Sequence, residues 1–188
     1  MESCRVAAAQ VRETMTSLLL PYRGKEPRLA ETVFLANGAC VIGDVVIGHE
    51  SSIWFNSVVR GDVNRIRIGE RTNIQDNSVL HVTSETHPLN IGDDITVGHR
   101  SILHGCTVED GCLIGMGAIV LDGAVVKRQA MVAAGTLLLE GFEVPEGMLA
   151  AGVPAKIKRP LTAEERQGLL RSARQYVEYA AVYRFTNY

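Results

Sequence analysis

The 188-residue sequence predicts a mainly β fold, a parallel β-helix of hexapeptide repeats with a C-terminal α-helix. The first observation is a period of six, because aliphatic residues stand at Ile102, Val108, Ile114, Val120, Val126, Val132, Leu138 and Val144. The second is a small residue two positions before most of them, namely Cys106, Cys112, Ala118, Ala124, Ala130 and Thr136. An α-helix repeats every 3.6 residues and a strand every two, whereas short strands wound round a three-sided prism repeat every six.

The same period runs through the earlier part of the chain, with two interruptions. One series extends from Leu35 to Val59, and three extra residues then precede a second series from Ile68 to Leu80. The gap from Leu80 to Ile102 is 22 residues (102 − 80), which is one coil of about 18 residues plus about four. This gap predicts a short loop near residues 83–89, within a prism of about six to seven coils between residues 33 and 150.

A C-terminal helix follows the repeats. The run TAEE is a capping box in which Glu165 reaches back to Thr162. Apolar residues then recur at helical spacing to about residue 184, namely Leu169, Leu170, Ala173, Tyr176, Val177, Ala180 and Tyr183. We therefore divide the chain into an N-terminal extension (1–20), a β-helix domain (21–160) and a C-terminal helix (161–188).

Composition excludes several classes of partner. The formal net charge of −2 gives no electrostatic reason to expect a nucleic-acid partner. No apolar run approaches the roughly 20 residues that span a bilayer, so no membrane partner is expected. The arginines between residues 60 and 71 alternate with Asp62 and Glu70, which indicates a mixed ion-pair surface.

The cysteines indicate a reducing compartment. None of the four forms a CxxC pair, and Cys106 and Cys112 occupy small inward positions of the repeat. We therefore expect a cytoplasmic protein. Residues 1–14 contain Glu2 and Glu13 and lack a signal-peptide core, so we interpret them as a poorly ordered extension.

Three of the five histidines lie outside the prism by their repeat phase. His81 comes one residue after Leu80. His99 comes three residues before Ile102, and His104 comes two residues after it. When the extra loop residues are subtracted from their separation in sequence, His81 and His104 are about one coil apart and lie on the same side of the prism. A corner of the prism turns His99 onto the next face. Within one chain, His99 is therefore too far from His81 and His104 to bind the same ion, since zinc–nitrogen bonds measure about 2.0–2.1 Å.

In a three-fold trimer, His99 can complete the site of the adjacent subunit. The other two histidines, His49 and His87, have no partner at useful spacing and are interpreted as surface or loop residues.

These residues carry a resemblance to a known family. RGDVNRIRIGERTNIQDNSVLH followed by VGHRSILHGC closely resembles the γ-class carbonic anhydrases, and the similarity extends over about residues 20–183. It implies a left-handed β-helix, a homotrimer and one metal at each subunit interface. His81 and His104 would come from one subunit and His99 from the next.

The resemblance also implies roles for neighbouring residues. Arg60 and Asp62, with Asp76 nearby, match residues that form ion pairs at the trimer interface. Gln75 and Asn73 match polar residues that orient the metal-bound solvent or the substrate. Tyr176 resembles a tyrosine that members with a shorter loop bring near the metal.

The predicted function is reversible hydration of CO₂ to bicarbonate by a metal-bound hydroxide. The default ion is Zn²⁺, and the same three histidines would accept Fe²⁺ or Co²⁺. The loop from Val82 to Asn90 is short and offers only Glu85 and His87 in place of the family's acidic proton shuttle. Two alternatives stay open: a hexapeptide acyltransferase with a histidine general base, and a metal-stapled trimeric scaffold.

Overall fold

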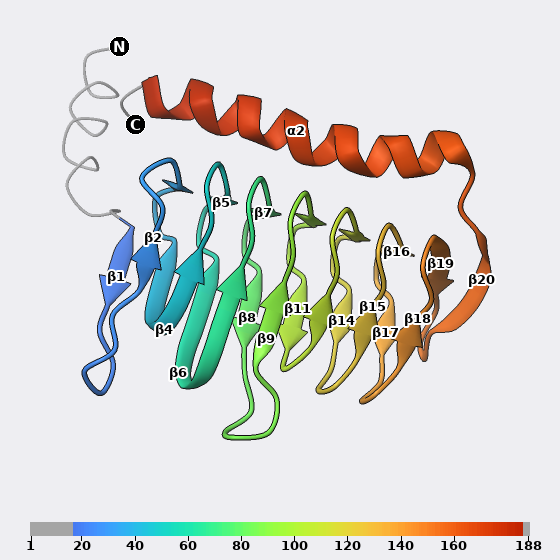
Figure 1. Cartoon of the computed structure of the whole chain (residues 1–188), viewed down its shortest axis with the longest axis horizontal. Coiled ribbons are helices and arrows are strands. Elements are labelled where there is room, and N and C mark those ends of the chain that lie inside the picture. The colour runs from blue at the N-terminus through green and yellow to red at the C-terminus, as the bar shows by residue number, and fades with distance from the viewer. Residues whose placement is uncertain (1–16, 186–188) are drawn as a thin grey trace, which may run out of the picture.

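The computed structural model describes residues 17–185 and shows the predicted parallel β-helix (Figure 1). Short strands stack coil upon coil, and one long helix lies along the outside of the stack. The helix-covered face carries seven parallel strands from β3 to β19, one for each coil, and the last strand, β20, is antiparallel to β19. The interpretation of residues 1–14 falls outside the described residues.

The strands form two hydrogen-bonded sheets. The eight-stranded sheet contains β3 (Phe34–Leu35), β5 (Ser52–Ile53), β7 (Asn73–Ile74), β10 (Thr96–Val97), β13 (Leu113–Ile114), β16 (Met131–Val132), β19 (Met148–Ala151) and β20 (Lys156–Pro160). The twelve-stranded sheet contains β1 (Leu18–Leu20), β2 (Arg28–Leu29), β4 (Cys40–Ile47), β6 (Val58–Ile68), β8 (Val79–His81), β9 (Leu89–Ile91), β11 (Ile102–His104), β12 (Thr107–Val108), β14 (Ile119–Val120), β15 (Val125–Val126), β17 (Leu137–Leu138) and β18 (Glu143–Val144).

The twelve-stranded sheet supplies two faces of the prism because β4 and β6 continue around a corner. The first half of β6 pairs with β8, and its second half pairs with β9. We call the face formed by β8, β11, β14 and β17 the histidine face, and the face formed by β9, β12, β15 and β18 the third face. Strand β1, which lies within the segment predicted as an extension, pairs in parallel with β4.

The core is the aliphatic column that the six-residue period predicts. Val108, Val120 and Val132 are buried, and so are the small residues that precede them. The thiols of Cys106 and Cys112 are free, and burial raises the pKa of each to about 12. At that pKa both stay protonated near neutral pH and pack as small apolar groups.

One position of the predicted period is wrong. Ile102 is 38% exposed, whereas Leu103 is fully buried and stacks on Leu80. Both residues are aliphatic, so the six-residue pattern cannot tell which of them faces inward. The pairing of β11 with β8 determines that Leu103 does. The repeat from Leu80 to Leu103 is therefore 23 residues (103 − 80), with five rather than four in the extra loop. The next coil, from Leu103 to Val120, is one residue short at 17 (120 − 103).

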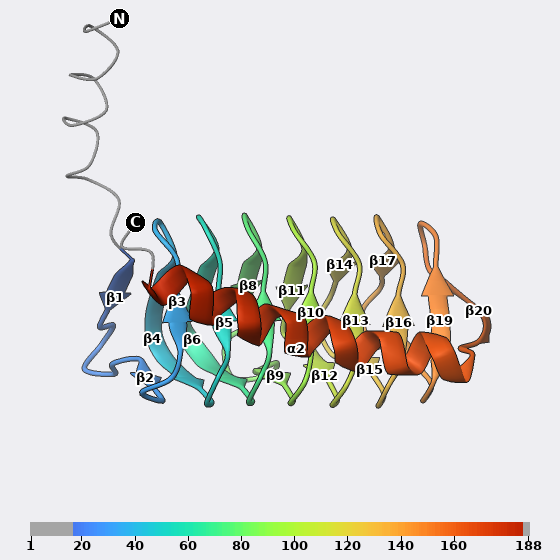
Figure 2. The same ribbon diagram turned by 90° about the horizontal axis from the view of Figure 1, so that it is seen from above.

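The C-terminal helix α2 (Ala163–Phe185) begins at the predicted capping box. The backbone N–H of Glu165 donates to Thr162 Oγ1 at 3.1 Å, and the N–H of Thr162 donates to Glu165 Oε2 at 2.8 Å. The helix lies across the eight-stranded face, as seen from above (Figure 2). Leu169, Ala173 and Ala180 are buried against that face, so α2 covers its own prism.

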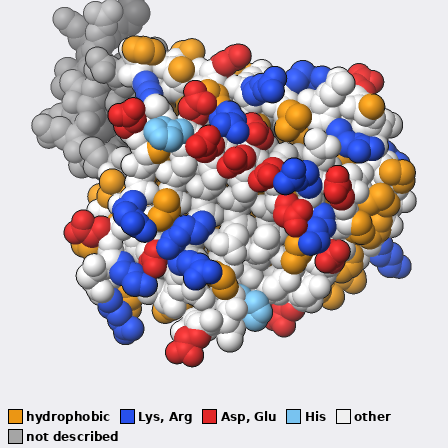
Figure 3. Space-filling model, viewed as in Figure 1, with side chains coloured by type: hydrophobic (Ala, Val, Ile, Leu, Met, Phe, Trp, Pro, Cys, Tyr) orange, Lys and Arg blue, Asp and Glu red, His pale blue; other side chains and the backbone are white. Residues whose placement is uncertain are grey.

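The surface is a mixture of both charges (Figure 3). Arg60 pairs with Asp62, Arg67 with Asp44, and Arg71 with Asp94, as the alternation of charges predicts. Within residues 17–185 no helix is both long and apolar enough to cross a membrane.

Two adjacent leucines, one at the end of β17 and one directly after it, allow a test of which side chains face into the prism. Leu138 is fully buried and Leu139 is 46% exposed. We expect Leu138→Ala to lower the free energy of unfolding by about 2–5 kcal/mol because it leaves a cavity in the column. Leu139→Ala should cost less than about 0.5 kcal/mol. Thermal and urea unfolding measure both, and equal losses would contradict the assigned orientation.

Candidate metal centre

The structure brings His81 and His104 together on the histidine face. His81 ends β8, His104 ends β11, and the two residues are direct partners in the parallel register. Each follows a buried leucine, so both rings point out of the prism. His81 Nδ1 lies 3.1 Å from His104 Nε2. Their predicted proximity is confirmed, and their role as ligands stays a prediction.

The outer nitrogen of each ring is occupied by a carboxylate. His81 Nε2 lies 3.0 Å from Asp62 Oδ1, and His104 Nδ1 lies 2.6 Å from Asp122 Oδ1. An ionised carboxylate only accepts hydrogen bonds, so these nitrogens carry the protons. In neutral rings the two inner nitrogens therefore both present lone pairs to each other. That arrangement needs a cation between them, either a proton or a metal ion.

Both carboxylates are held in the ionised form. Burial raises the pKa of Asp62, but hydrogen bonds from His81 and Arg60 outweigh it and leave the pKa below its usual value. Burial likewise raises the pKa of Asp122, and hydrogen bonds from Thr83 and His104 outweigh that effect. Two anionic acceptors therefore fix which nitrogen of each ring is free.

The third histidine lies at the opposite edge of the histidine face. His99 follows β10 at the corner, and its Nδ1 lies 2.7 Å from Asp76 Oδ2. Five residues separate His99 from His104, a span of roughly 16 Å in an extended strand. Within residues 17–185 of one chain, no three His, Cys, Asp or Glu side chains are placed to hold a metal ion. One chain thus presents two candidate half-sites: His81 with His104, and His99 alone.

The donor chemistry of the half-sites fits a divalent transition metal. Metal-binding histidines almost always donate their other N–H to a carboxylate or carbonyl, and all three histidines lie against an aspartate. Two nitrogen ligands of a tetrahedral zinc ion lie about 3.3–3.4 Å apart when each bond is about 2.0–2.1 Å. The 3.1 Å separation of His81 and His104 is close to that value.

Gln75 and Asn73 lie on the side of His99 rather than beside His81 and His104. Both are buried on the helix-covered face, and Gln75 directly precedes Asp76. Gln75 Nε2 donates to Asn73 Oδ1 at 3.1 Å, and Asn73 Nδ2 donates to Thr96 Oγ1 at 3.0 Å. Thr96 Oγ1 lies 3.0 Å from Ser172 Oγ of α2. Within the described residues, Gln75 Oε1 accepts no hydrogen bond.

Tyr176 also lies on the side of His99. Its ring packs edge-on against Trp54, with centroids 5.3 Å apart, and it lines a pocket of about 340 Å³ together with Asp76. Burial raises the pKa of Tyr176, and the nearby Asp76 carboxylate raises it further. The phenol is therefore neutral near pH 7 and can donate a hydrogen bond.

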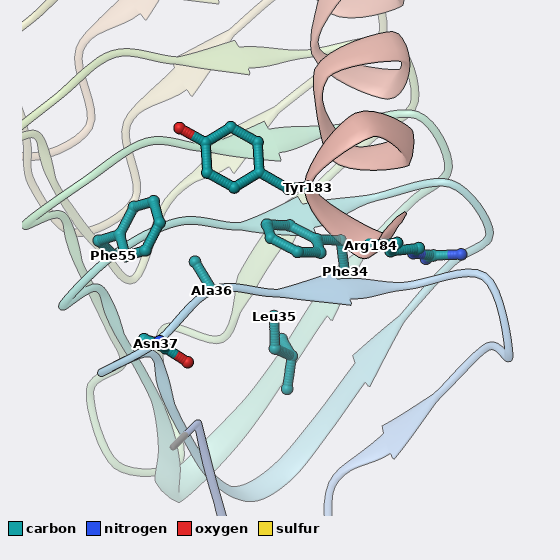
Figure 4. Close-up of a pocket in the computed structure, with 7 residues that line it drawn as sticks. All are labelled: Phe34, Leu35, Ala36, Asn37, Phe55, Tyr183 and Arg184. Carbon is teal, nitrogen blue, oxygen red and sulfur yellow. The ribbon is translucent and has the colours of Figure 1, made fainter. Parts of the chain in front are cut away.

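A second hollow lies near the C-terminal end of α2. Phe34, Phe55, Tyr183 and Arg184 are among its lining residues, and none of the five histidines contributes to it (Figure 4).

Asp122 is the site residue that the sequence analysis missed. It stands 18 residues after His104 (122 − 104), which is one coil, so the repeat itself contained the signal. His87 lies in the loop after β8, as predicted, but it has a partner that the sequence spacing does not indicate, because its Nδ1 lies 3.8 Å from Asp122 Oδ2. His49 lies away from the site and is bonded to Thr32.

Comparison with known proteins yields close relatives, although no family model matches the chain. Mitochondrial γ-carbonic anhydrase 2 of Arabidopsis thaliana is 48% identical over 168 residues, covering 87% of this chain and 60% of the plant protein. The chain thus spans about three fifths of that relative. A carbonic anhydrase of Geobacillus kaustophilus is 47% identical over 167 residues, covering 89% and 91% of the two chains.

Other relatives carry transferase names. The uncharacterized transferase YtoA of Bacillus subtilis is 47% identical over 168 residues, covering 89% of this chain and 98% of YtoA. The crystal structure of a hexapeptide transferase family protein from Anaplasma phagocytophilum has a TM-score of 0.85 at 46% identity, covering 88% of this chain and 98% of that one.

The repeat, the prism and the paired outward histidines define a hexapeptide-repeat β-helix protein with two stacked histidines on its outer surface. With close carbonic anhydrase relatives that match along most of its length, the chain belongs to the γ-class carbonic anhydrase family.

The buried hydrogen bonds that run from Gln75 through Asn73 to Thr96, here called the amide chain, allow a test of how Gln75 is held. We expect Asn73→Ala to lower the free energy of unfolding by about 1–3 kcal/mol, because it leaves Gln75 Nε2 without its acceptor in a buried position. Asn90→Ala is the matched control, since within the described residues the Asn90 side chain makes no hydrogen bond. Chemical unfolding compares the two, and an equal effect would show that the amide chain is not structural.

Proposed function

We propose that this chain is a zinc-dependent carbonic anhydrase, a lyase that interconverts CO₂ and bicarbonate as a homotrimer. The observation that carries the proposal is the pair of inner nitrogens of His81 and His104, which face each other at 3.1 Å with their outer nitrogens committed to carboxylates. Carbonic anhydrase relatives that match most of the chain support the same activity.

A trimer would unite the two half-sites. His81 and His104 of one subunit and His99 of the next would then hold the ion. The apolar side chains of Val79 and Ile102 are 40% and 38% exposed on the same face, between the two half-sites. Covering them with a neighbouring subunit would remove apolar area from water, which favours association through this face.

A divalent ion held by three neutral imidazoles lowers the pKa of water to about 7 and so supplies a nucleophile near neutral pH. Zinc suits a site of nitrogen ligands, and Fe²⁺ or Co²⁺ would also be accepted. The carboxylates of Asp62, Asp76 and Asp122 each orient one ring, which keeps the three lone pairs available.

Gln75 would orient the reacting water. Its amide NH₂ is committed to Asn73, so Oε1 has a fixed direction and can accept one O–H. Holding that proton at Oε1 would leave a lone pair of the water oxygen free to face the carbon of CO₂. Near neutral pH, the protonated Tyr176 can donate its O–H to an oxygen of CO₂ or bicarbonate.

CO₂ is small and apolar, and the pocket beside Asp76 has suitable walls. Trp54, Phe55 and Tyr179 line it with aromatic surface next to the His99 half-site. The proton released during hydration would leave through the loop after β8. Glu85 is exposed at its tip, and the His87 side chain is 42% exposed at its end.

A cytoplasmic location is part of the proposal. Its support is the use of cysteine, because the three cysteines within residues 17–185, Cys40, Cys106 and Cys112, are all free thiols.

An acyltransferase is the second candidate, favoured by the transferase names of two close relatives. It requires an acyl-CoA and one histidine base, with no need for a metal. A purified protein that binds coenzyme A and shows no metal-dependent CO₂ hydration would support it.

Removal of metal tests the proposed chemistry directly. We expect the purified protein to contain about one zinc ion per subunit and to lose CO₂ hydration after treatment with a chelator, since hydration depends on the ion. Zinc should restore the activity. Stopped-flow hydration assays and elemental analysis measure both quantities. A zinc-loaded protein without activity would instead indicate a metal-stapled scaffold.

Mixing two inactive variants tests whether the site is shared. His81→Ala and His99→Ala each destroy every site in a homogeneous trimer. In randomly mixed trimers at equal amounts, about one quarter of the interfaces combine the intact half of each variant (½ × ½). We therefore expect co-expression to restore about one quarter of the zinc and of the activity.

The matched control for this experiment is co-expression of His81→Ala with His104→Ala. Both variants damage the same half-site, so no interface regains all three histidines. Restoration in the control, or none in the test mixture, would contradict a site divided between subunits.

A further inference from the structure

We propose that the loop after β8 acts as a strap that positions His104, with Thr83 and Asp122 as the positioning residues. The loop spans residues 83–87 and is closed by an antiparallel bridge between Thr83 and His87. The inference rests on the proposed metal site and concerns how one of its ligands is held.

One carboxylate joins the loop to the histidine. Thr83 Oγ1 donates to Asp122 Oδ2 at 2.5 Å, while His104 Nδ1–H donates to Asp122 Oδ1 at 2.6 Å. Each oxygen of Asp122 therefore accepts one hydrogen bond, and His87 Nδ1 lies a further 3.8 Å from Oδ2. The carboxylate cannot turn away from His104 without breaking the bond to Thr83.

The loop itself is anchored on the opposite side. Asn64 Nδ2 donates to the backbone carbonyl of Thr83 at 3.0 Å, from the corner where β6 turns between two faces. The chain of contacts thus runs from Asn64 through Thr83 and Asp122 to the imidazole of His104. Its members come from four successive coils.

The five extra residues of this coil give the loop the length it needs. Thr83 precedes the coil that contains His104, and Asp122 belongs to the coil that follows, so the loop passes over one whole coil. Two glycines make room for it. A Cβ on Gly105, which has φ +54°, would lie 2.7 Å from the Cβ of His87. A Cβ on Gly123, which has φ +69°, would lie 3.3 Å from His87 Nε2.

His81, the partner of His104, is oriented in the same way by a carboxylate, with different residues. Asp62 orients His81 through one oxygen and is itself bonded to Arg60 through the other. Each carboxylate thus has a second donor that fixes its rotation. For His104 that donor is a loop hydroxyl, which keeps the proton on Nδ1 and the lone pair of Nε2 directed at His81.

The test compares variants of the full-length protein. Thr83→Val removes the hydroxyl and keeps the shape, Thr83→Ser retains the hydroxyl, and Asp122→Ala removes the acceptor. Thr107→Val is the matched control, because within residues 17–185 the Thr107 side chain makes no hydrogen bond. Zinc affinity is measured by competition with a chromophoric chelator, which requires no catalytic activity.

We expect Asp122→Ala to bind zinc roughly 10–100-fold more weakly, as is usual when a partner of a metal-binding histidine is lost. Thr83→Val should weaken binding roughly 2–10-fold, which corresponds to the loss of one hydrogen bond. Thr83→Ser and Thr107→Val should bind like the unmodified protein. Unchanged affinity in Thr83→Val and Asp122→Ala would overturn the proposal.

A second measurement uses the metal-free protein. Long-range ¹H–¹⁵N spectra report which imidazole nitrogen carries the proton, and we expect a single Nδ1–H form of His104 in the unmodified protein and in Thr83→Ser. Thr83→Val and Asp122→Ala should show a mixture of the two forms. The same single form in all variants would reject the strap, even if the unmodified protein bound no zinc and the proposed function failed.

Discussion

Parallel stacking of coils is the constraint on which the rest of the structure depends. Each coil hydrogen-bonds to the next through parallel strands, so a residue lies directly over its counterpart one repeat earlier. Leu80 and Leu103 stack inside the prism because of this register, and His81 and His104 stack outside it for the same reason. The aliphatic column and the histidine pair are thus two consequences of a single set of backbone hydrogen bonds.

Charge is arranged around the histidines to leave one nitrogen of each ring free. Asp62, Asp76 and Asp122 each lie against one imidazole, from corners or neighbouring coils. Two facing lone pairs at 3.1 Å cost free energy unless a cation lies between them. The register brings the two rings together and the carboxylates fix their outer protons, so the inner nitrogens are placed to bind a cation. A coordinating ion would remove the repulsion.

Much of the architecture could be predicted from the sequence because the repeat is simple. The period of six identified the inward column, and the capping box at Thr162 located the start of α2. The assignment failed at Ile102, where two neighbouring aliphatic residues compete and only pairing with β8 decides. Asp122 was missed because its role depends on the side-chain directions of two coils. The position of Gln75 beside His99 likewise depends on a corner that a linear pattern does not describe.

The strict alternation of inward and outward side chains separates the demands of folding from those of chemistry. Leu80 and Leu103 contribute to the core, while their immediate neighbours His81 and His104 face outward and contribute little to it. An outward residue can therefore change without loss of the column beneath it. In such a framework new chemistry can evolve by substitution on the surface of an unaltered prism. Proteins of this shape can thus diverge in activity while they retain the same fold.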